Sequence, residues 1–270
     1  MVLQRKLEDH ISLTGMINSD TIGVIMELLQ LIKDAKHIVV FTGAGLSTES
    51  GIPDFRSSSG LYLSGKYEGY TPEHILSQRF FRQNKPIFFS FYTERIMSMR
   101  DKEPNRAHYS IAKLQSKGKI NSVINQNIDN LLQKAGVLNV FDLHGNITTF
   151  RCTSACGKNY DGTDYMKLME NSEIPKCDCG GIVRPNTVLF DECLNDEVYD
   201  AAYREAKRCD LMISIGSSLV VRPVCELINE IEDNAKLVII NKASTPYDKK
   251  ADLIINRPCG EVLEEVANQL

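Results

Sequence analysis

A series of short apolar segments, separated by stretches with helical patterns, limits the fold of this chain more than any other feature. Segments of this length that are apolar throughout are typical of strands buried on both faces, as in parallel sheets whose crossovers are helices. We therefore predict an α/β fold with a doubly wound, parallel, Rossmann-like sheet. The expected strands are residues 37–41, 120–124, 140–143, 211–215, 237–240 and 253–255.

Two segments interrupt this alternation. Residues 57–104 begin with a polar loop and continue with aromatic-rich helical patterns, which predict a small helical layer. Residues 151–183 contain four cysteines, few aliphatic residues and several turn formers, which indicate a small inserted module. The segments that remain, and that we expect to form the Rossmann-like domain, are residues 21–56, 105–150 and 184–270.

The N-terminus and the composition exclude several classes of protein. Residues 1–20 lack the continuous apolar run of a secretory signal, so we expect an extension before a helix over residues 21–33, which Ser19 or Asp20 caps. No apolar run approaches the ~20 residues that span a bilayer. The formal net charge of −4 argues against direct binding of nucleic acid or of an acidic membrane surface. We therefore expect a cytoplasmic protein whose cysteines are thiols or metal ligands rather than disulfides.

A glycine turn follows the first expected strand. Gly43-Ala44-Gly45 comes after residues 37–41, although Thr48 occupies the position of the third glycine in the G-x-G-x-x-G pattern. Such a turn lets backbone N–H groups approach a pyrophosphate, and the helix N-terminus that follows adds a favourable partial charge. The triplet alone is equally consistent with a tight structural turn.

Polar residues at the ends of two later strands favour a ligand. Gly216-Ser217-Ser218 follows one strand, and Asn241-Lys242 follows another. Ligands of open α/β sheets bind at the carboxyl ends of the strands. Together with the glycine turn, these strand ends predict one extended nucleotide laid across them.

Two further strand ends carry groups suited to chemistry. The segment from Asn125 to Asp129 offers amides and a carboxylate, which suit ribose hydroxyls and a carboxamide. His144, followed by Gly145, comes at the end of residues 140–143, where a histidine can act as a general base near pH 7. A single histidine is more often structural, and it is the combination with the other polar strand ends that favours catalysis.

Several motifs of the chain resemble those of the sirtuins, the Sir2 family of NAD-dependent protein deacylases, in their bacterial type. In chain order they are GAGLSTESGIPDFR, PNRAHYSIAKLQ, QNIDNLLQKAG, LHGNI, RPNTVLFDE, GSSL and INK. The resemblance extends from about Thr21 to the C-terminus. It implies a protein lysine deacetylase or deacylase that consumes NAD and yields free lysine, nicotinamide and O-acyl-ADP-ribose.

The resemblance also implies roles for individual residues. The acyl oxygen of the substrate attacks the ribose carbon, Phe55 shields that carbon after nicotinamide leaves, and His144 takes a proton from a ribose hydroxyl, which then attacks the imidate. Asn127 binds the ribose or a nearby water, while Ile52 and Asp129 hold the nicotinamide. The full set implied to bind NAD is Gly43, Ala44, Gly45, Ile52, Asp54, Phe55, Arg56, Gln126, Asn127, Ile128, Asp129, His144, Gly216, Ser217, Ser218, Asn241 and Lys242.

An acyl-lysine protein or peptide is the partner that the resemblance implies. Its extended main chain would pair with a strand edge at Val188, Leu189 and Phe190, a mode that gives affinity with little demand on sequence. Relatives that remove acidic acyl groups carry a tyrosine and an arginine three residues apart. No arginine lies at that spacing from Tyr62, so we expect an uncharged acyl group such as acetyl.

Two other functions are open to a chain with these motifs. One is the transfer of ADP-ribose to protein, which some relatives perform, and the other is a non-catalytic module that senses NAD. Relatives specialised for transfer can lack the base, and a binding module does not need one. The presence of His144 with Asn127 and Asp129 therefore favours deacylation.

The cysteines of residues 151–183 occupy the position of the family's zinc module. Cys152 and Cys156 have C-x-x-x-C spacing, and Cys177 and Cys179 have C-x-C spacing, whereas the family pattern is C-x-x-C twice. Four thiolates can still surround a structural Zn²⁺ if the turns differ, with reduced thiols as the alternative. The other cysteines, which we expect to be small buried hydrophobic residues, are Cys193, Cys209, Cys225 and Cys259.

Overall fold

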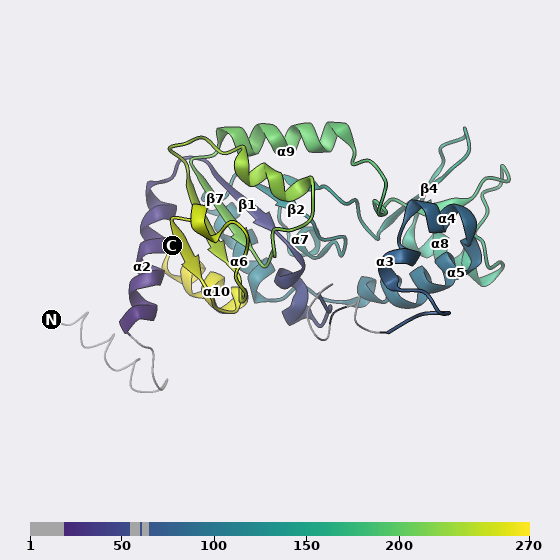
Figure 1. Ribbon diagram of the computed structural model, residues 1–270, viewed down its shortest axis with the longest axis horizontal. Helices are drawn as coiled ribbons and strands as arrows, with labels where there is room; N and C mark the ends of the chain where they lie inside the picture. The colour runs from purple at the N-terminus through teal and green to yellow at the C-terminus, as the bar shows by residue number, and fades with distance from the viewer. Residues whose placement is uncertain (1–18, 55–59, 61–64) are drawn as a thin grey trace.

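The computed structural model describes residues 19–54, 60 and 65–270. Two lobes lie along its long axis, with the N-terminal helix and the C-terminus in one lobe and the cysteine module in the other (Figure 1). Most of the predicted N-terminal extension lies outside the described residues. The predicted site residues Phe55 and Arg56, and the segment around Tyr62, also lie outside them.

The large lobe contains a six-stranded parallel sheet in the order β3-β2-β1-β7-β8-β9. Counted along the chain, this is the 3-2-1-4-5-6 order of dinucleotide-binding folds, and the order reverses between β1 and β7. The predicted α/β class is confirmed, and the predicted strand bounds differ by two residues at most. The strands are β1 (Ile38–Thr42), β2 (Ser122–Asn125), β3 (Val140–Asp142), β7 (Leu211–Ile215), β8 (Lys236–Ile240) and β9 (Leu253–Ile255).

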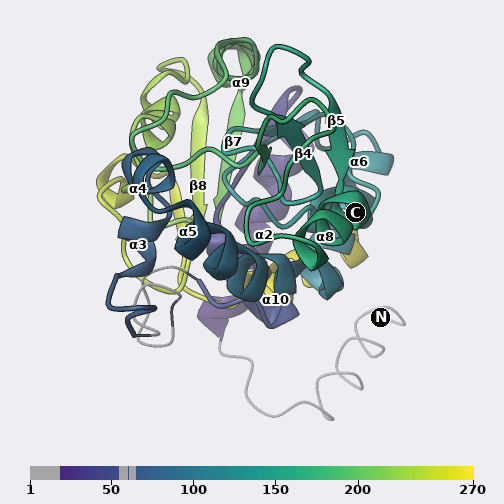
Figure 2. The same ribbon diagram turned by 90° about the vertical axis from the view of Figure 1, so that its right-hand side faces the viewer.

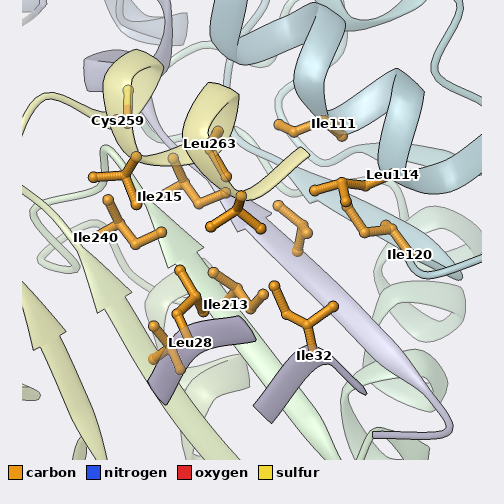
Figure 3. Close-up of a cluster of buried hydrophobic side chains, with 14 of the residues drawn as sticks. Leu28, Ile32, Ile111, Leu114, Ile120, Ile213, Ile215, Ile240, Cys259 and Leu263 are labelled. Carbon is orange, nitrogen blue, oxygen red and sulfur yellow. The ribbon is translucent and has the colours of Figure 1, made fainter. Parts of the chain in front are cut away.

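Alternating residues of the strands face two separate cores, which explains why whole strands read as apolar. Ile38 and Val40 of β1 belong to one core, and Val39 and Phe41 belong to the other. The first core lies under α2 (Ser19–Asp34), α6 (Arg106–Ser116) and α10 (Cys259–Gln269), as Figure 3 shows for its leucines and isoleucines. The second core lies under α9 (Asp196–Arg208) and the 3₁₀ helix Val224–Asn229.

Two more short helices complete the large lobe. A 3₁₀ helix, Ala44–Ser50, follows β1 directly, and α7 (Leu131–Lys134) follows β2. The predicted first helix is confirmed as α2, and it includes Ser19 and Asp20, the residues expected to cap it. Within the described part of the chain, no helix combines the length and apolar character needed to cross a membrane.

The small lobe joins the predicted helical layer to the cysteine module. Short helices come from the first, and a three-stranded antiparallel sheet in the order β5-β4-β6 comes from the second (Figure 2). Aromatic side chains from both parts share one core, where Phe150 and Tyr165 stack with ring centroids 4.1 Å apart. The main elements are α3 (Pro72–Ile75), α4 (Gln78–Gln83), α5 (Lys85–Phe91), β4 (Thr149–Cys152), β5 (Asn159–Asp161), α8 (Gly162–Glu170) and β6 (Val183–Pro185).

Candidate active site

A cleft of about 1070 Å³ is lined by residues from both lobes, at the carboxyl ends of the parallel strands. This volume is at the upper end of ligand cavities and suits a dinucleotide together with part of a second ligand. The described site residues that line it are Ala44, Gly45, Asp54, Gln126, Asn127, Ile128, His144, Val188, Leu189, Phe190, Gly216, Ser217, Ser218, Asn241 and Lys242. Gly43, Ile52 and Asp129 lie behind this lining.

The glycine turn packs against the end of the neighbouring strand. A Cβ atom at Gly43 or at Gly45 would lie 2.8 Å from the carbonyl oxygen of Gly216, so only glycine fits at either position. The N–H groups of Gly43 and Gly45 donate to the carbonyls of Ile215 and Gly216, at 3.0 and 2.8 Å. These two N–H groups are therefore occupied. Both glycines pack at the topological switch point between β1 and β7, and Gly45 also lines the cleft.

A buried hydrogen-bond network fixes the polar segment that follows β2. The side-chain amide of Asn127 donates to the Gly43 carbonyl at 3.0 Å and to the Ser47 hydroxyl at 3.2 Å. Ser47 in turn donates to the Asp129 carboxylate at 2.6 Å. Burial raises the pKa of Asp129 above its usual value, and the Ser47 hydrogen bond partly offsets that rise.

Asn125 supports this segment from within β2. Its side-chain oxygen accepts hydrogen bonds from the Thr42 hydroxyl at 2.8 Å and from the Asn127 N–H at 3.0 Å. Its side-chain nitrogen donates to the Asn127 carbonyl and to the Asp142 carboxylate, at 2.9 and 2.7 Å. The Asn125 amide was predicted to contact a ligand, whereas the structure buries it as a support for this segment. Ser47 and Asp142 were not predicted at all, because their hydrogen-bond partners come from other elements of the chain.

Gln126 offers an unused donor to the cleft. Its side-chain nitrogen is buried and has no hydrogen-bond partner among the described residues, although the residue lines the cavity. An amide buried without a partner is costly unless a ligand or water satisfies it. This atom and the glycine-lined strand ends fit a polar ligand such as NAD.

His144 is held in one tautomer. Its Nδ1 lies 2.9 Å from the carbonyl oxygen of Gln126, which can only accept, so Nδ1 carries the proton and Nε2 is left as an acceptor. Burial lowers the pKa of His144 below its usual value, and the hydrogen bond to Gln126 opposes this shift. A neutral imidazole with a free Nε2 in a ligand cleft is equipped to act as a general base.

The backbone around His144 is tied to the predicted substrate segment. The Val188 N–H donates to the carbonyl of His144 at 2.9 Å. Gly145 adopts a left-handed conformation with φ of 68°, and a Cβ atom there would overlap the carbonyl oxygen of Asn186. The histidine and residues 186–188 are therefore positioned together.

The predicted substrate edge is more occupied than a free strand. The N–H groups of Val188, Leu189 and Phe190 donate to His144, Glu192 and Leu76, and the Phe190 carbonyl accepts from Gln78. The Val188 carbonyl accepts no hydrogen bond from the described residues. A peptide that pairs here must therefore use the Val188 carbonyl and the backbone that follows Phe190.

The predicted ligand residues that follow β7 and β8 also have partners within the protein. Ser217 is buried, and its hydroxyl accepts a hydrogen bond from the Leu219 N–H at 3.2 Å. The side-chain amide of Asn241 donates to the Ala243 carbonyl at 2.7 Å. The cleft is also lined by residues that were not predicted, because none of them belongs to a sequence motif that indicates ligand binding. They include Glu49, Val221, Arg222, Pro223 and Arg257.

The four cysteines of the small lobe converge on one point. Their Sγ atoms all lie within 4.8 Å of one another, with Cys152–Cys179 at 3.6 Å, Cys156–Cys177 at 3.7 Å and Cys156–Cys179 at 3.3 Å. Tetrahedral Zn–S bonds of about 2.3 Å place sulfurs about 3.8 Å apart. The atypical spacing therefore still fits a structural zinc ion, and four protein ligands leave no open position for chemistry.

The remaining cysteines divide into two kinds. Cys209, Cys225 and Cys259 are buried, as expected. The same expectation was wrong for Cys193, which is exposed and lines the cleft. It lies in the loop between the predicted substrate segment and α9.

The fold and this site define an α/β protein of the dinucleotide-binding type, with a cleft beside a candidate base and a four-cysteine centre. Residues 43–223 match the model of the Sir2 family. The chain therefore belongs to the Sir2 family.

Relatives and solved structures agree with this assignment. The chain is 45% identical over 243 residues to an NAD-dependent protein deacetylase of Clostridium acetobutylicum, covering 90% of this chain and 97% of the relative. It is 46% identical over 245 residues to a protein of the same description from Clostridium tetani, with the same coverage. A solved complex of Sir2 with a p53 peptide and NAD⁺ superposes with a TM-score of 0.82 at 39% identity, covering 91% of this chain and 98% of the other. A Sir2 complex with a propionylated peptide gives 0.81 at 38% identity, with the same coverage.

Proposed function

We propose that this chain is an NAD-dependent protein-lysine deacetylase. The observation that carries the proposal is a neutral, partly buried His144 whose Nε2 has no hydrogen-bond partner among the described residues, in a cleft of dinucleotide size. Membership of the Sir2 family and relatives described as NAD-dependent protein deacetylases support the same activity. The three products are the free lysine of the peptide, nicotinamide and O-acetyl-ADP-ribose.

NAD is a substrate in this reaction and supplies the ribose carbon to which the acyl oxygen bonds as nicotinamide leaves. His144 accepts a proton at Nε2 from a ribose hydroxyl, while its Nδ1–H remains on the Gln126 carbonyl. The resulting imidazolium is stabilised by this carbonyl, as a base held by a second group requires. The side-chain nitrogen of Gln126 provides a further donor inside the cleft.

The side chains of Asn127 and Asp129 are held in place by the same residue, Ser47. Ser47 bridges the two side chains, so the amide and the carboxylate keep fixed positions before a ligand arrives. We assign Asn127 to the ribose side and Asp129, with Ile52, to the nicotinamide side. Ser217, Ser218, Asn241 and Lys242 then serve the adenosine side, beyond the switch point.

The peptide binds between the lobes, with its acyl-lysine entering the cleft beside the segment Val188–Phe190. The hydrogen bond from Val188 to the His144 carbonyl places this segment next to the base. The zinc ion holds the small lobe that carries the segment and has no role in the reaction. We place the protein in the cytoplasm, where the buried and exposed thiols described here persist without disulfides.

The experiment that tests this function is product analysis of the zinc-loaded protein with NAD and an acetyl-lysine peptide. Mass spectrometry should detect deacetylated peptide, nicotinamide and O-acetyl-ADP-ribose in equal amounts, and no deacetylation without NAD. ADP-ribose on protein without deacetylation would replace this function with transferase activity. If the protein binds NAD but forms no product from any acylated peptide, it is a non-catalytic binding module.

The same assay tests the acyl group. We expect an acetyl peptide to react faster than a succinyl peptide of the same sequence. Faster removal of succinyl would overturn the assignment of an uncharged acyl group without affecting the NAD-dependent reaction.

A further inference from the structure

A second cavity, of about 360 Å³, lies in the small lobe and is lined by three arginines. Arg82 comes from α4, Arg151 from β4 and Arg184 from β6. Gln78 and Thr153 add neutral polar groups to the same wall. Phe81 and Cys152 complete the lining, so the cavity adjoins the four-cysteine centre, and none of its residues belongs to the predicted NAD site.

The sheet register places two of the guanidinium groups side by side. Arg151 is the direct antiparallel partner of Arg184, so both side chains leave the sheet on one face. Like charges directly opposite each other destabilise a strand pair. The arrangement is therefore unfavourable unless negative charge lies between them.

The protein supplies only part of this charge. Arg184 forms a two-pronged ion pair with Glu192, with N···O distances of 2.8 and 2.9 Å. Arg82 and Arg151 form no ion pair with any residue that the structure describes, although Arg151 contributes to the low pKa of Glu192. Among the described residues, Glu192 is therefore the only carboxylate that pairs with any of the three cations.

The zinc centre does not balance this excess. Four thiolates around Zn²⁺ carry a net negative charge, and Cys152 is the neighbour of Arg151 in β4. Side chains of neighbouring strand residues point to opposite faces. Cys152 also lines the cavity, but its Sγ lies against the Sγ of Cys179 and the N–H of Ser154, and it accepts no hydrogen bond from an arginine that the structure describes.

Arg184 also keeps a free donor. Its guanidinium has five N–H groups, and four of them donate to Pro185, Thr187 and the two oxygens of Glu192. One N–H at Nη1 has no acceptor among the described residues, on a side chain that is only 7% exposed. An unused donor on a buried cation that lines a cavity points to an acceptor in that cavity.

We propose that this cavity binds a phosphate-type oxyanion between Arg82, Arg151 and Arg184. Planar guanidinium groups bind tetrahedral oxyanions through paired N–H···O bonds, which suits the three groups better than a single carboxylate would. The proposal is independent of the deacetylase function.

Arg184 connects the cavity to the segment Val188–Phe190 through hydrogen bonds. Glu192, the partner of Arg184, accepts a hydrogen bond from the Leu189 N–H at 3.0 Å, and Arg184 itself donates to the Thr187 carbonyl at 3.0 Å. Occupancy of the cavity therefore acts on the segment that carries the peptide and not on the NAD side. In the active protein, phosphate should change the KM for the peptide and leave the KM for NAD unchanged.

Calorimetric titration with inorganic phosphate tests the proposal. The zinc-loaded protein is saturated with NAD, so that phosphate cannot occupy the large cleft, and ionic strength is held constant with KCl. We expect saturable binding that is weakened at least tenfold in Arg82→Gln and in Arg151→Gln. Both side chains are exposed, so both variants should fold, which circular dichroism checks.

Arg79→Gln is the matched control. Arg79 is exposed on the same helix, α4, but does not line the cavity, so this variant should bind phosphate like the unmodified protein. Absence of saturable binding to the unmodified protein would overturn the proposal. Equal affinity in all three variants would also overturn it, because phosphate would then bind elsewhere.

Discussion

The two lobes are stabilised in different ways. In the large lobe, β1, β2 and β7 are buried throughout and aliphatic side chains fill the cores on both faces of the sheet. In the small lobe, three short antiparallel strands and short helices enclose an aromatic core, and an ion pair and four cysteines hold the rest. The large lobe therefore depends on apolar burial, and the small lobe depends on polar and metal contacts in addition to its aromatic core.

This difference matters because the active site needs both lobes. His144 and most residues that we propose to bind NAD lie at the strand ends of the large sheet, whereas Val188–Phe190 pair with the helices of the small lobe. One backbone hydrogen bond, from Val188 to the His144 carbonyl, joins them. We therefore expect changes in the small lobe to affect the peptide first, and changes in the large lobe to affect overall stability first.

Removal of zinc should produce the largest difference in stability between the two lobes. Structural zinc sites contribute on the order of 10 kcal/mol to folding, so a chelator should unfold the small lobe and leave the parallel sheet folded. Hydrogen exchange measured by mass spectrometry should speed up across residues 149–185 and remain slow in β1 and β7. Cys177→Ser should behave like the chelator.

Cys193→Ser is the control for this experiment, because Cys193 is exposed and lies outside the cluster. It should keep the slow exchange of the unmodified protein. Unchanged exchange across residues 149–185 after metal removal would show that the aromatic core alone holds the small lobe.

The next largest effect should come from Arg184→Met. This change leaves Glu192, whose side chain is 15% exposed, without its partner, and breaking a buried ion pair in this way costs about 3–5 kcal/mol. We expect a lower midpoint of chemical denaturation for the small lobe and a higher KM for the peptide, with the KM for NAD unchanged.

A surface pair in the large lobe provides the contrast. The Nζ of Lys236 and the Oδ1 of Asp252 lie 2.8 Å apart, but their side chains are 52% and 33% exposed. Asp252→Asn should therefore lower the free energy of unfolding by less than about 1 kcal/mol. A similar loss of stability in the two variants would contradict the difference between the lobes.

The large lobe contains a buried histidine, His108, that should make its stability depend on pH. Burial lowers the pKa of His108 to about 4, and its Nε2 has no hydrogen-bond partner among the described residues. The folded protein therefore keeps His108 neutral where the unfolded chain binds a proton. Stability should fall by about 3 kcal/mol as the pH drops from about 6.5 to about 4.

Denaturation of His108→Gln over the same pH range provides the comparison. The glutamine removes the titrating group, so the pH dependence assigned to it should disappear. An identical pH dependence in both proteins would assign the acid sensitivity to other groups.

The sequence predicted the large lobe better than the small one. Strands such as Leu211–Ile215 have the same bounds in the prediction and in the structure, because burial on both faces makes every residue apolar. The cysteine module was located, but its closure by C-x-x-x-C and C-x-C turns depends on the turns that lead into Gly157 and Gly180, both at positive φ. Local patterns do not determine how two such turns meet.

The candidate site shows the same limit. Polar residues at strand ends predicted His144 and Asn127, because parallel strands end at one edge of the sheet. The proton on Nδ1 of His144 and the bridge through Ser47 could not be predicted, because both depend on the directions of distant backbone and side-chain groups. Cys193 was assigned to the core by residue type alone, and its loop position decided otherwise.

The pH profile of kcat/KM for deacetylation, in the unmodified protein and in His144→Ala, tests the central claim most directly. Because the pKa of His144 is lowered, the midpoint of the acid limb in the unmodified protein should lie below the ordinary histidine value of about 6.5. His144→Ala should be at least ~100-fold slower and show no such acid limb. A variant within tenfold of the unmodified protein, or one with the same acid limb, would contradict His144 as the base.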